Sequence, residues 1–324
     1  MERKYVCANG VVERTRYLVP DRAQARGRKK KGNTSFRKQE ANFNSAVRRA
    51  ARILNCNYGH ENGLLLTLDY ADDALDRLIG KLGAEDRETL QALRLPVGQI
   101  GTWQAPEKAK KASIAAAADH AMRALKEAAE PELTNYLRRL RRKTGAELKF
   151  LSVTSDLDAA TGEVVRVHHH VVLCVKRIDN PSVTASPCHL PLHKGGKGAD
   201  VDGVSWDMLR DCWKNGGVDI RQLRRQRDYT PIASYLLRQV RHTPDAKAYR
   251  VSRGMILPEI TEREVLGHAE IKAPAGAVVV ERSAFNPETV TQYIRYIPKK
   301  VAYGNSALQA EEKASGVRRK KYGD

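Results

Sequence analysis

The chain has 324 residues, 41% of them hydrophobic, which is enough to bury a core in one large domain or two modest ones. Lys and Arg number 57 against 38 Asp and Glu, and this net charge of +19 points to a polyanionic partner, with nucleic acid as the leading candidate. No apolar run approaches the roughly 20 residues of a spanning helix, the N-terminus lacks the apolar core of a signal peptide, and no two cysteines form a C-x-x-C pair. We therefore expect a cytoplasmic protein without a membrane partner, a disulfide framework or a structural zinc site.

Residues 1–34 are predicted to form a basic N-terminal arm. A short strand-like opening is followed by a basic run over 26–32, which is typical of a mobile linker. Such runs also bind phosphates without sequence preference, so Arg28, Lys29 and Lys30 are candidate DNA-binding residues. A solvated linker explains the same composition equally well.

The next segments alternate between helix and strand. Apolar residues recur at helical spacing over 35–54, with basic residues off the apolar stripe, so we expect an amphipathic helix with a basic side. Residues 64–70 form a compact apolar run after a glycine, with the length of a buried strand. Residues 71–147 have a mostly helical pattern, and Pro131 within them should break or kink the helix.

A dense group of basic residues follows Pro131. Arg138, Arg139, Arg141 and Arg142 fall within one or two helical turns. They form either a surface that faces phosphate groups or a solvated face, and the first interpretation makes them candidate DNA-binding residues.

The most distinctive stretch is the apolar run over 164–175, which contains three adjacent histidines. A strand-like segment over 147–156 and a set of turn residues precede it, so the two segments predict an antiparallel hairpin. Side chains alternate between the faces of a strand, which places His168 and His170 on one face and His169 on the other. Two imidazoles on one face can bind a single metal ion, and the alternative is three histidines with ordinary hydrogen bonds on a half-buried strand.

A turn and a helix complete the pattern. Residues 213–220 predict a glycine-containing turn into a short strand, and residues 228–241 predict a helix with Pro231 in its first turn. Tyr235 and Arg238 are three residues apart and share one face of that helix. Taken alone, such a pair is more often a core tyrosine beside a surface cation.

In their order, these segments resemble the HUH endonuclease superfamily, in particular the replication initiators of rolling-circle plasmids, integrative elements and phages. The stretch 64–70 (LLLTLDY) is similar to the first family motif. The stretch 168–173 (HHHVVL) is similar to the metal-binding second motif, and 235–238 (YLLR) to the tyrosine motif. The resemblance covers residues 35–260 and includes the stretch 249–258.

The resemblance implies an α+β fold in which a central antiparallel β-sheet carries the His-x-His strand. Helices flank this sheet, as in the palm of an RNA-recognition motif. We expect an endonuclease domain over 35–260 with a helical insertion around 71–147, preceded by the basic arm of 1–34. Residues 261–324 are expected to form a C-terminal extension with a basic tail.

The resemblance also implies a metal-dependent site. His168 and His170 would bind a divalent cation, Mn²⁺ or Mg²⁺, with Asp156 as the third ligand. The chain departs from the family in two ways: Arg238 stands where lysine is usual, and the acid that often precedes the hairpin is missing. Arg238 keeps a permanent positive charge but cannot donate a proton. Ser155 competes with Asp156 for the position of the missing acid, and the strand register decides between them.

The implied activity is site-specific nicking and rejoining of one DNA strand at a replication origin. Tyr235 would attack a phosphodiester to form a 5′-phosphotyrosine link and release a 3′-hydroxyl for a polymerase, with Arg238 as the cation that favours the phenolate. The match over 249–258 adds Arg250 and Arg253 as DNA-binding residues. Expected partners are single-stranded DNA or an origin hairpin, with the host helicase and polymerase as further candidates.

Several alternatives stay open at this point. Tyr293 and Tyr296 share a face and are followed closely by lysines, so they are rival nucleophiles. A non-catalytic nucleic-acid-binding protein on a degenerate HUH fold would keep the motifs without the reaction. A relaxase or a transposase would use the same chemistry on another target, but the position of the tyrosine after the histidines favours an initiator.

Overall fold

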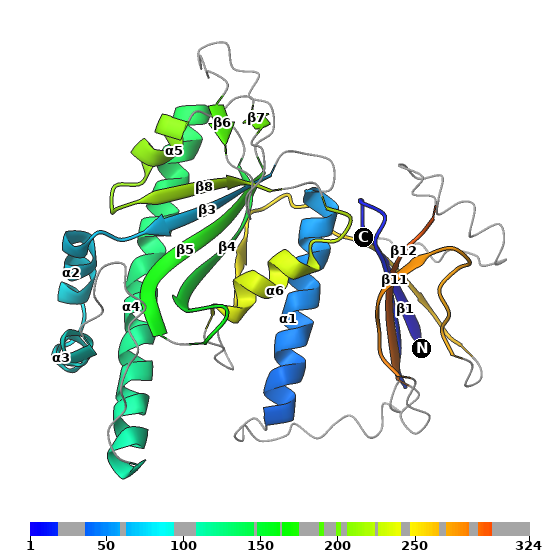
Figure 1. The fold of residues 1–324 in the computed structure, drawn as a ribbon, viewed down its shortest axis with the longest axis horizontal. Coiled ribbons are helices and arrows are strands. Elements are labelled where there is room, and N and C mark those ends of the chain that lie inside the picture. The colour runs from blue at the N-terminus through cyan, green and yellow to red at the C-terminus, as the bar shows by residue number, and fades with distance from the viewer. Residues whose placement is uncertain are drawn as a thin grey trace, which may run out of the picture.

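Two antiparallel β-sheets of five strands each, with the helices that cover them, organise the chain (Figure 1). This architecture confirms the α+β class.

The computed structural model describes residues 1–18, 36–58, 63–93, 108–145, 148–162, 164–174, 188–190, 199–201, 206–223, 226–240, 247–265, 270–284 and 291–299. None of the helices in these ranges is long and apolar enough to cross a membrane. The expected DNA-binding residues Arg28, Lys29 and Lys30 lie outside these ranges.

The central sheet has the strand order β8-β3-β5-β4-β9, and each neighbouring pair is antiparallel. Its middle strand is the histidine strand, which is covered on both faces, as its long apolar run requires. The predicted hairpin is confirmed: in the turn that joins β4 to β5, Asp158 accepts two backbone hydrogen bonds and Gly162 has a φ of 71°. The strands of this sheet are β3 (Gly63–Asp69), β4 (Lys149–Leu157), β5 (Val164–Cys174), β8 (Val218–Gln222) and β9 (Arg250–Val251).

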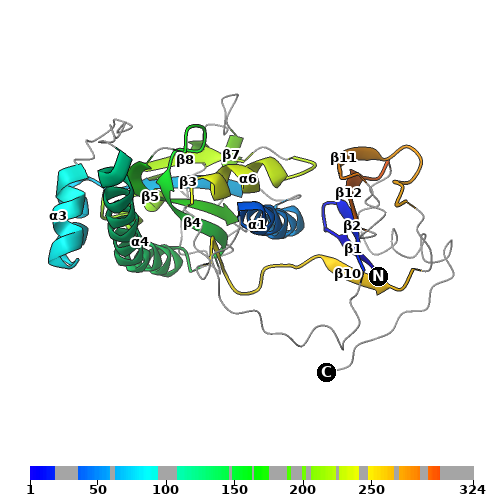
Figure 2. The ribbon, with the colours of Figure 1, turned by 90° about the horizontal axis from the view of Figure 1, so that it is seen from below.

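One face of the central sheet packs against a helical layer built around α4, and the other packs against α1 and α6 (Figure 2). Leu66 and Val171 face the α4 layer, whereas Leu65 and Val172 face α1 and α6. The expected helices over 35–54 and 228–241 are therefore confirmed as the second layer. The helices are α1 (Phe36–Asn57), α2 (Asp72–Gly80), α3 (Ala84–Leu93), α4 (Lys108–Thr144), α5 (Trp206–Cys212) and α6 (Thr230–Arg238).

Helix α4 continues through Pro131, so of the predicted break or kink at this proline, the break is wrong. A proline inside a helix removes one backbone hydrogen bond and costs roughly 3 kcal/mol. The helix buries Leu125 before the proline and Leu133 and Tyr136 after it against the same core. Burial of each such side chain contributes about 1.5–3 kcal/mol, so packing on both sides of Pro131 outweighs the missing bond.

The two ends of the described chain form the second sheet, here called the terminal sheet, with the order β10-β1-β2-β12-β11. The sequence assigns 1–34 and 261–324 to separate segments, but the structure pairs strands from both. An isolated hairpin such as β1–β2 is marginally stable in water, and pairing with later strands supplies the missing neighbours. These strands are β1 (Glu2–Val6), β2 (Val12–Arg16), β10 (Glu259–Arg263), β11 (Val278–Arg282) and β12 (Gln292–Ile297), and a separate two-stranded ribbon contains β6 (Cys188–Leu190) and β7 (Ala199–Val201).

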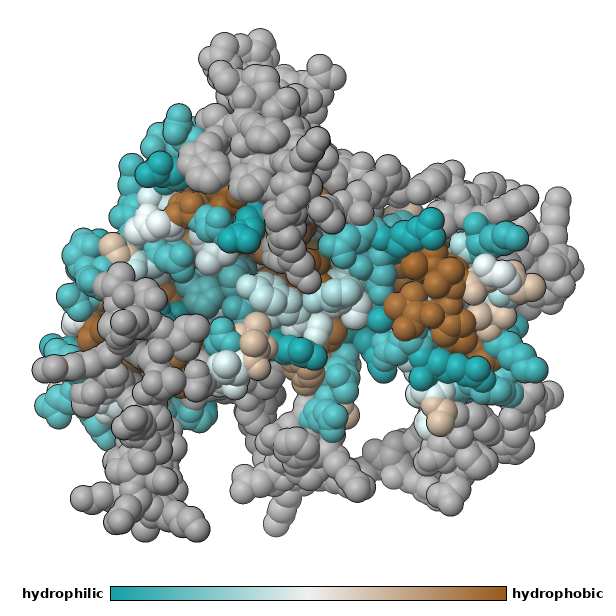
Figure 3. All heavy atoms as spheres, viewed as in Figure 1, coloured by the Kyte–Doolittle hydropathy of each residue, from teal (hydrophilic) through white to brown (hydrophobic). Residues whose placement is uncertain are grey.

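The surface of the terminal sheet carries an apolar patch in the space-filling view (Figure 3). Val278, Val279 and Val280 of the edge strand β11 are exposed. Polar and charged residues dominate most of the remaining described surface on this side (Figure 3). The terminal sheet is thus buried on its inner strand β12 and open at its edge.

Candidate functional site

The alternation along β5 sends its histidines to two different environments. His168 and His170 face the layer of α1 and α6, and the rings of His170 and Tyr235 lie 5.8 Å apart between centroids. His169 faces α4, where its ring contacts Tyr70 and Trp213. The face assignment made from the sequence therefore agrees with the structure.

The Nε2 atoms of His168 and His170 lie 3.1 Å apart. Nδ1 of His168 is 2.8 Å from the carbonyl oxygen of Arg166, which can only accept, so this nitrogen carries the proton and Nε2 presents its lone pair. Thr67 Oγ1, 3.1 Å from Nδ1 of His170, allows His170 to take the same tautomer. Hydrogen bonds of this kind orient metal-binding imidazoles.

Gln239 adds an oxygen to the two nitrogens, with its Oε1 3.0 Å from Nε2 of His170. Its Nε2 donates to the carbonyl of Tyr235 at 3.3 Å, which turns the oxygen towards the histidine. Neighbouring ligands of an octahedral ion with bonds of about 2.1 Å are roughly 3.0 Å apart, so the distance from His170 Nε2 to each of the other two atoms suits such an ion. In the described part of the chain no three His, Cys, Asp or Glu side chains form such a group.

The sequence analysis missed Gln239, although a signal was present. Tyr235 and Gln239 are four residues apart, a spacing that puts two side chains on one face of a helix. Gln239 follows the last residue of α6 as its C-cap and is nearly fully buried. A buried polar side chain next to two histidines is therefore the residue that an i, i+4 search from Tyr235 would have found.

Asp156 does not join this group, contrary to the expectation that it is the third ligand. Ser155 is the residue paired with His168, and a register shift follows between Ser155 and Leu157. The carboxylate of Asp156 is fully buried and lies 3.0 Å from Nζ of Lys126 on α4, on the opposite face of the sheet. The strand register thus gives the position of the missing acid to Ser155, whose buried Oγ has no hydrogen-bond partner among the described residues.

Asp69 is a second residue that the sequence analysis did not single out. It is the cross-strand partner of His168 on β3, so the two side chains share a face. Burial and then the nearby Asp219 raise the pKa of Asp69, while His168 and Arg166 oppose this shift. The turn after α5 holds the end of β3, because Trp213 Nε1 donates to the carbonyl of Asp69 at 2.8 Å.

Tyr235 is the accessible tyrosine among the candidates, with 37% of its surface exposed. The rivals Tyr293 and Tyr296 are 4% and 1% exposed and belong to β12 of the terminal sheet. Burial raises the pKa of the Tyr293 phenol. Arg238 is exposed at the end of α6, and no ion pair ties it to another described residue. The structure thus brings Tyr235, and neither rival, to the histidines.

His169 has a closed set of partners on the other face. Its Nε2 is 2.8 Å from the hydroxyl of Tyr70, and its Nδ1 is 3.0 Å from Oγ1 of Thr154. Thr154 donates to the carboxylate of Glu130 and therefore accepts from Nδ1–H of His169. Complete burial, with the nearby charges of His168 and other cations, lowers the pKa of His169 to about 3. His169 is a neutral, packed residue.

The expected DNA-binding arginines divide into engaged and exposed residues. Arg139 donates to the carbonyl of Cys212 at 2.8 Å, and Arg250 forms an ion pair with Glu130 at 2.7 Å. Internal acceptors thus engage one nitrogen of Arg139 and one of Arg250, and a phosphate-binding role for either residue stays a prediction. The remaining expected residues in the described ranges are exposed: Arg138, Arg141, Arg142 and Arg253.

Comparisons of this chain with models of protein families, with curated proteins and with solved structures found no match. The case for a function rests on the geometry of the histidine face. We refer to His168, His170 and Gln239 as the converging set.

Proposed function

We propose that this protein nicks and rejoins one strand of DNA, with Tyr235 as the nucleophile, in the manner of HUH replication initiators. The observation that carries the proposal is the position of an exposed tyrosine 5.8 Å, between ring centroids, from His170 of the converging set. A central antiparallel sheet with the two histidines on one face and the tyrosine helix packed over that face is what the HUH palm requires. The activity proposed here is initiation of rolling-circle replication.

The converging set suits a divalent cation with nitrogen and oxygen ligands, such as Mn²⁺ or Mg²⁺. His168 presents an unprotonated Nε2. Nε2 of His170 can donate to Gln239 Oε1, and a cation would take the place of that proton while Thr67 Oγ1 accepts from Nδ1 of His170. The hydroxyl of Ser155, which has no hydrogen-bond partner in the described part of the chain, adds a polar group beside His168. When bound, the cation would neutralise the non-bridging phosphate oxygens and make phosphorus a better electrophile.

The side chains of the chain account for the remaining steps. The phenol oxygen of Tyr235 forms a bond to phosphorus as its proton leaves, and the bond from phosphorus to the 3′-oxygen breaks. The departing oxygen takes up a proton and becomes a 3′-hydroxyl. Attack of that hydroxyl on the phosphotyrosine reverses the reaction and rejoins the strand. Arg238, one turn after Tyr235, supplies a permanent charge for the scissile phosphate.

The proposed partner is single-stranded DNA or the unpaired part of an origin hairpin. The charge of +19 supplies the general attraction for phosphates. Among the expected contacts, Arg238 lies on the tyrosine helix and is exposed, and Arg253 is an exposed cation elsewhere on the same domain. A single strand is favoured because its backbone can approach Tyr235, which stands on a short helix rather than on a flexible arm.

The decisive experiment incubates the protein with a pool of labelled single-stranded oligonucleotides of random sequence and Mn²⁺. We expect a protein–DNA adduct that survives denaturant, disappears with protease and is not formed in the presence of a chelator. Tyr235→Phe should abolish the adduct. Tyr293→Phe is the matched control, because the buried Tyr293 hydroxyl has no partner among the described residues and its removal costs little. DNA binding without an adduct, or an adduct formed by Tyr235→Phe, would contradict the proposal.

A further inference from the structure

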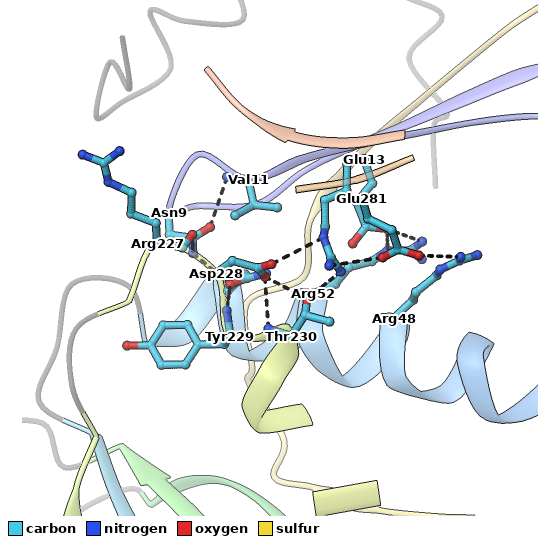
Figure 4. Close-up of polar contacts among 12 residues, drawn as sticks. Asn9, Val11, Glu13, Arg48, Arg52, Arg227, Asp228, Tyr229, Thr230 and Glu281 are labelled. Atoms are coloured by element: carbon cyan, nitrogen blue, oxygen red, sulfur yellow. Dashed lines mark hydrogen bonds and ion pairs between the residues drawn. The ribbon is translucent and has the colours of Figure 1, made fainter. Parts of the chain in front are cut away.

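Charged side chains of the terminal sheet contact α1 and the start of α6 (Figure 4), beside a small apolar cluster that Cys56 of α1 forms with Cys7, Val11 and Ile297. Glu13 of β2 is fully buried and lies 2.7 Å from Nη2 of Arg52 on α1. The guanidinium of Arg52 also stacks 3.5 Å from the ring centre of Tyr5. Arg48, one turn earlier on α1, lies over the ring of Tyr293 and pairs with Glu281 on β11.

Arg295 of β12 extends this contact to the helix that carries Tyr235. Its Nη1 donates to Oγ1 of Thr230 at 2.6 Å, and its Nε lies 3.4 Å from Oδ2 of Asp228. Its Nη2 is 3.1 Å from Glu281. The side chain of Arg295 is only 6% exposed, so water screens these contacts little.

Asp228 and Thr230 define the beginning of α6. Oδ1 of Asp228 accepts hydrogen bonds from the backbone N–H and the hydroxyl of Thr230 at 3.0 and 2.8 Å. Asn55 of α1 donates to the same oxygen at 3.1 Å. The first turn of α6 is therefore held from two directions, by α1 through Asn55 and by the terminal sheet through Arg295.

A displacement at this first turn would reach Tyr235 directly. Helix α6 has nine residues, and Tyr235 stands five residues after Thr230. One side of the helix is apolar and buried, through Ile232, Ala233, Leu236 and Leu237. The helix can therefore slide or rotate over this apolar surface more easily than it can move in other directions. Polar contacts at one end resist such motion because they are directional, whereas apolar packing is not.

We propose that Arg295 is a positioning residue for the reaction of Tyr235, and that the terminal sheet acts through it to set the orientation of α6. This inference rests on the proposed function. A buried ion pair adds little net stability compared with an apolar contact of similar volume, but it demands one geometry. The contacts of Arg295 can therefore fix the orientation of α6, and this matters because a small misplacement of a nucleophile can cost about 100-fold in rate.

The test compares Arg295→Met, Arg295→Lys and Arg282→Met. Methionine keeps much of the apolar volume of arginine but removes the contacts to Asp228 and Thr230, whereas lysine keeps a cation. Arg282→Met is the matched control, since Arg282 is on the same sheet and pairs with the exposed Glu270 rather than with α6. Two measurements are made on the full chain: the kinetics of adduct formation, and hydrogen exchange of the backbone amides.

We expect Arg295→Met to lower kcat for adduct formation about tenfold or more, with KM for DNA changed less than twofold. Arg295→Lys should give an intermediate kcat, and Arg282→Met should equal the original protein. Hydrogen exchange should accelerate in α6 of Arg295→Met while β3 stays protected. If Arg295→Met does not fold, the comparison of Arg295→Lys with the original protein decides by the same two measurements.

Unchanged kcat and unchanged exchange in α6 would overturn the inference. A loss of protection throughout α6, β3 and β5 together would also overturn it, because Arg295 would then be a general stabilising residue. If the original protein forms no adduct, the proposed function fails, and the exchange measurement still decides whether Arg295 orients α6.

Discussion

Gln239 places its Oε1 3.0 Å from Nε2 of His170 and donates its amide to the carbonyl of Tyr235. One side chain therefore contacts both the histidine face and the backbone of the tyrosine helix. This relationship links the two halves of the proposed site. A change in the positions of His168 or His170 would therefore reach the backbone of Tyr235 through the side chain of Gln239.

Replacement of Gln239 is the first prediction. Gln239→Ala should weaken Mn²⁺ binding by about tenfold or more, because an oxygen ligand is lost, whereas Gln239→Glu should retain binding through a carboxylate oxygen. Titration calorimetry with Mn²⁺ measures both. Asp156→Asn is the contrast: its carboxylate faces Lys126, so the variant should lose stability but keep its affinity for Mn²⁺. Loss of Mn²⁺ affinity in Asp156→Asn alone would restore Asp156 as the ligand.

His168 and His169 are adjacent in sequence and should respond differently to alanine. His168→Ala should abolish metal-dependent adduct formation with little effect on the fold. His169→Ala should lower the free energy of unfolding by roughly 2–4 kcal/mol, because it opens a cavity and removes one hydrogen-bond partner each from Tyr70 and Thr154. Urea unfolding and the adduct assay separate the two effects. Equal loss of cleavage in both variants, with both folded, would contradict the assignment of faces along β5.

The local parts of the site were predictable from the sequence. Strand alternation gave the faces of the three histidines, and helical spacing brought Tyr235 and Arg238 to one helix. The third ligand depended on the pairing register of β4, where a register shift sends Asp156 to Lys126 and leaves Ser155 beside His168. Such a shift has no signal in residue types alone. The same limit applies to the terminal sheet, because strand pairing between the two ends of a chain depends on tertiary contacts.

Gly216 and Gly217 form a matched pair for the third prediction. A Cβ on Gly216 would lie 2.2 Å from the carbonyl oxygen of Asp69 and 2.5 Å from the nitrogen of Ala71, whereas a Cβ on Gly217 meets nothing within 4 Å. Gly216→Ala should therefore destabilise the protein by roughly 3 kcal/mol or more, since backbone atoms must move. Gly217→Ala should change stability by less than about 0.5 kcal/mol. Thermal unfolding compares the two, and equal effects would contradict the close approach of this turn to β3.

The acid stability of the terminal sheet gives the fourth prediction, which concerns Glu2. Burial alone would raise the pKa of this carboxyl, but hydrogen bonds and charges, Arg14 first and then Arg16 and Arg263, lower the pKa below its usual 4.5. Because the folded pKa is the lower one, the ionised carboxylate stabilises the fold fully above pH 4.5 and loses this contribution as the pH falls through the folded value. Glu2→Gln should therefore cost on the order of 2 kcal/mol at pH 7, and the difference from the original protein should shrink below pH 4.5.

Urea unfolding of both proteins between neutral and acidic pH measures the change that Glu2→Gln causes. Glu262→Gln serves as the control, because Glu262 is 44% exposed and its pairing with Arg3 is screened by water. Glu262→Gln should have a much smaller effect at every pH. A stability difference for Glu2→Gln that stays constant from pH 7 into the acidic range would mean that packing, rather than the charge of Glu2 among three arginines, holds β1 in the terminal sheet.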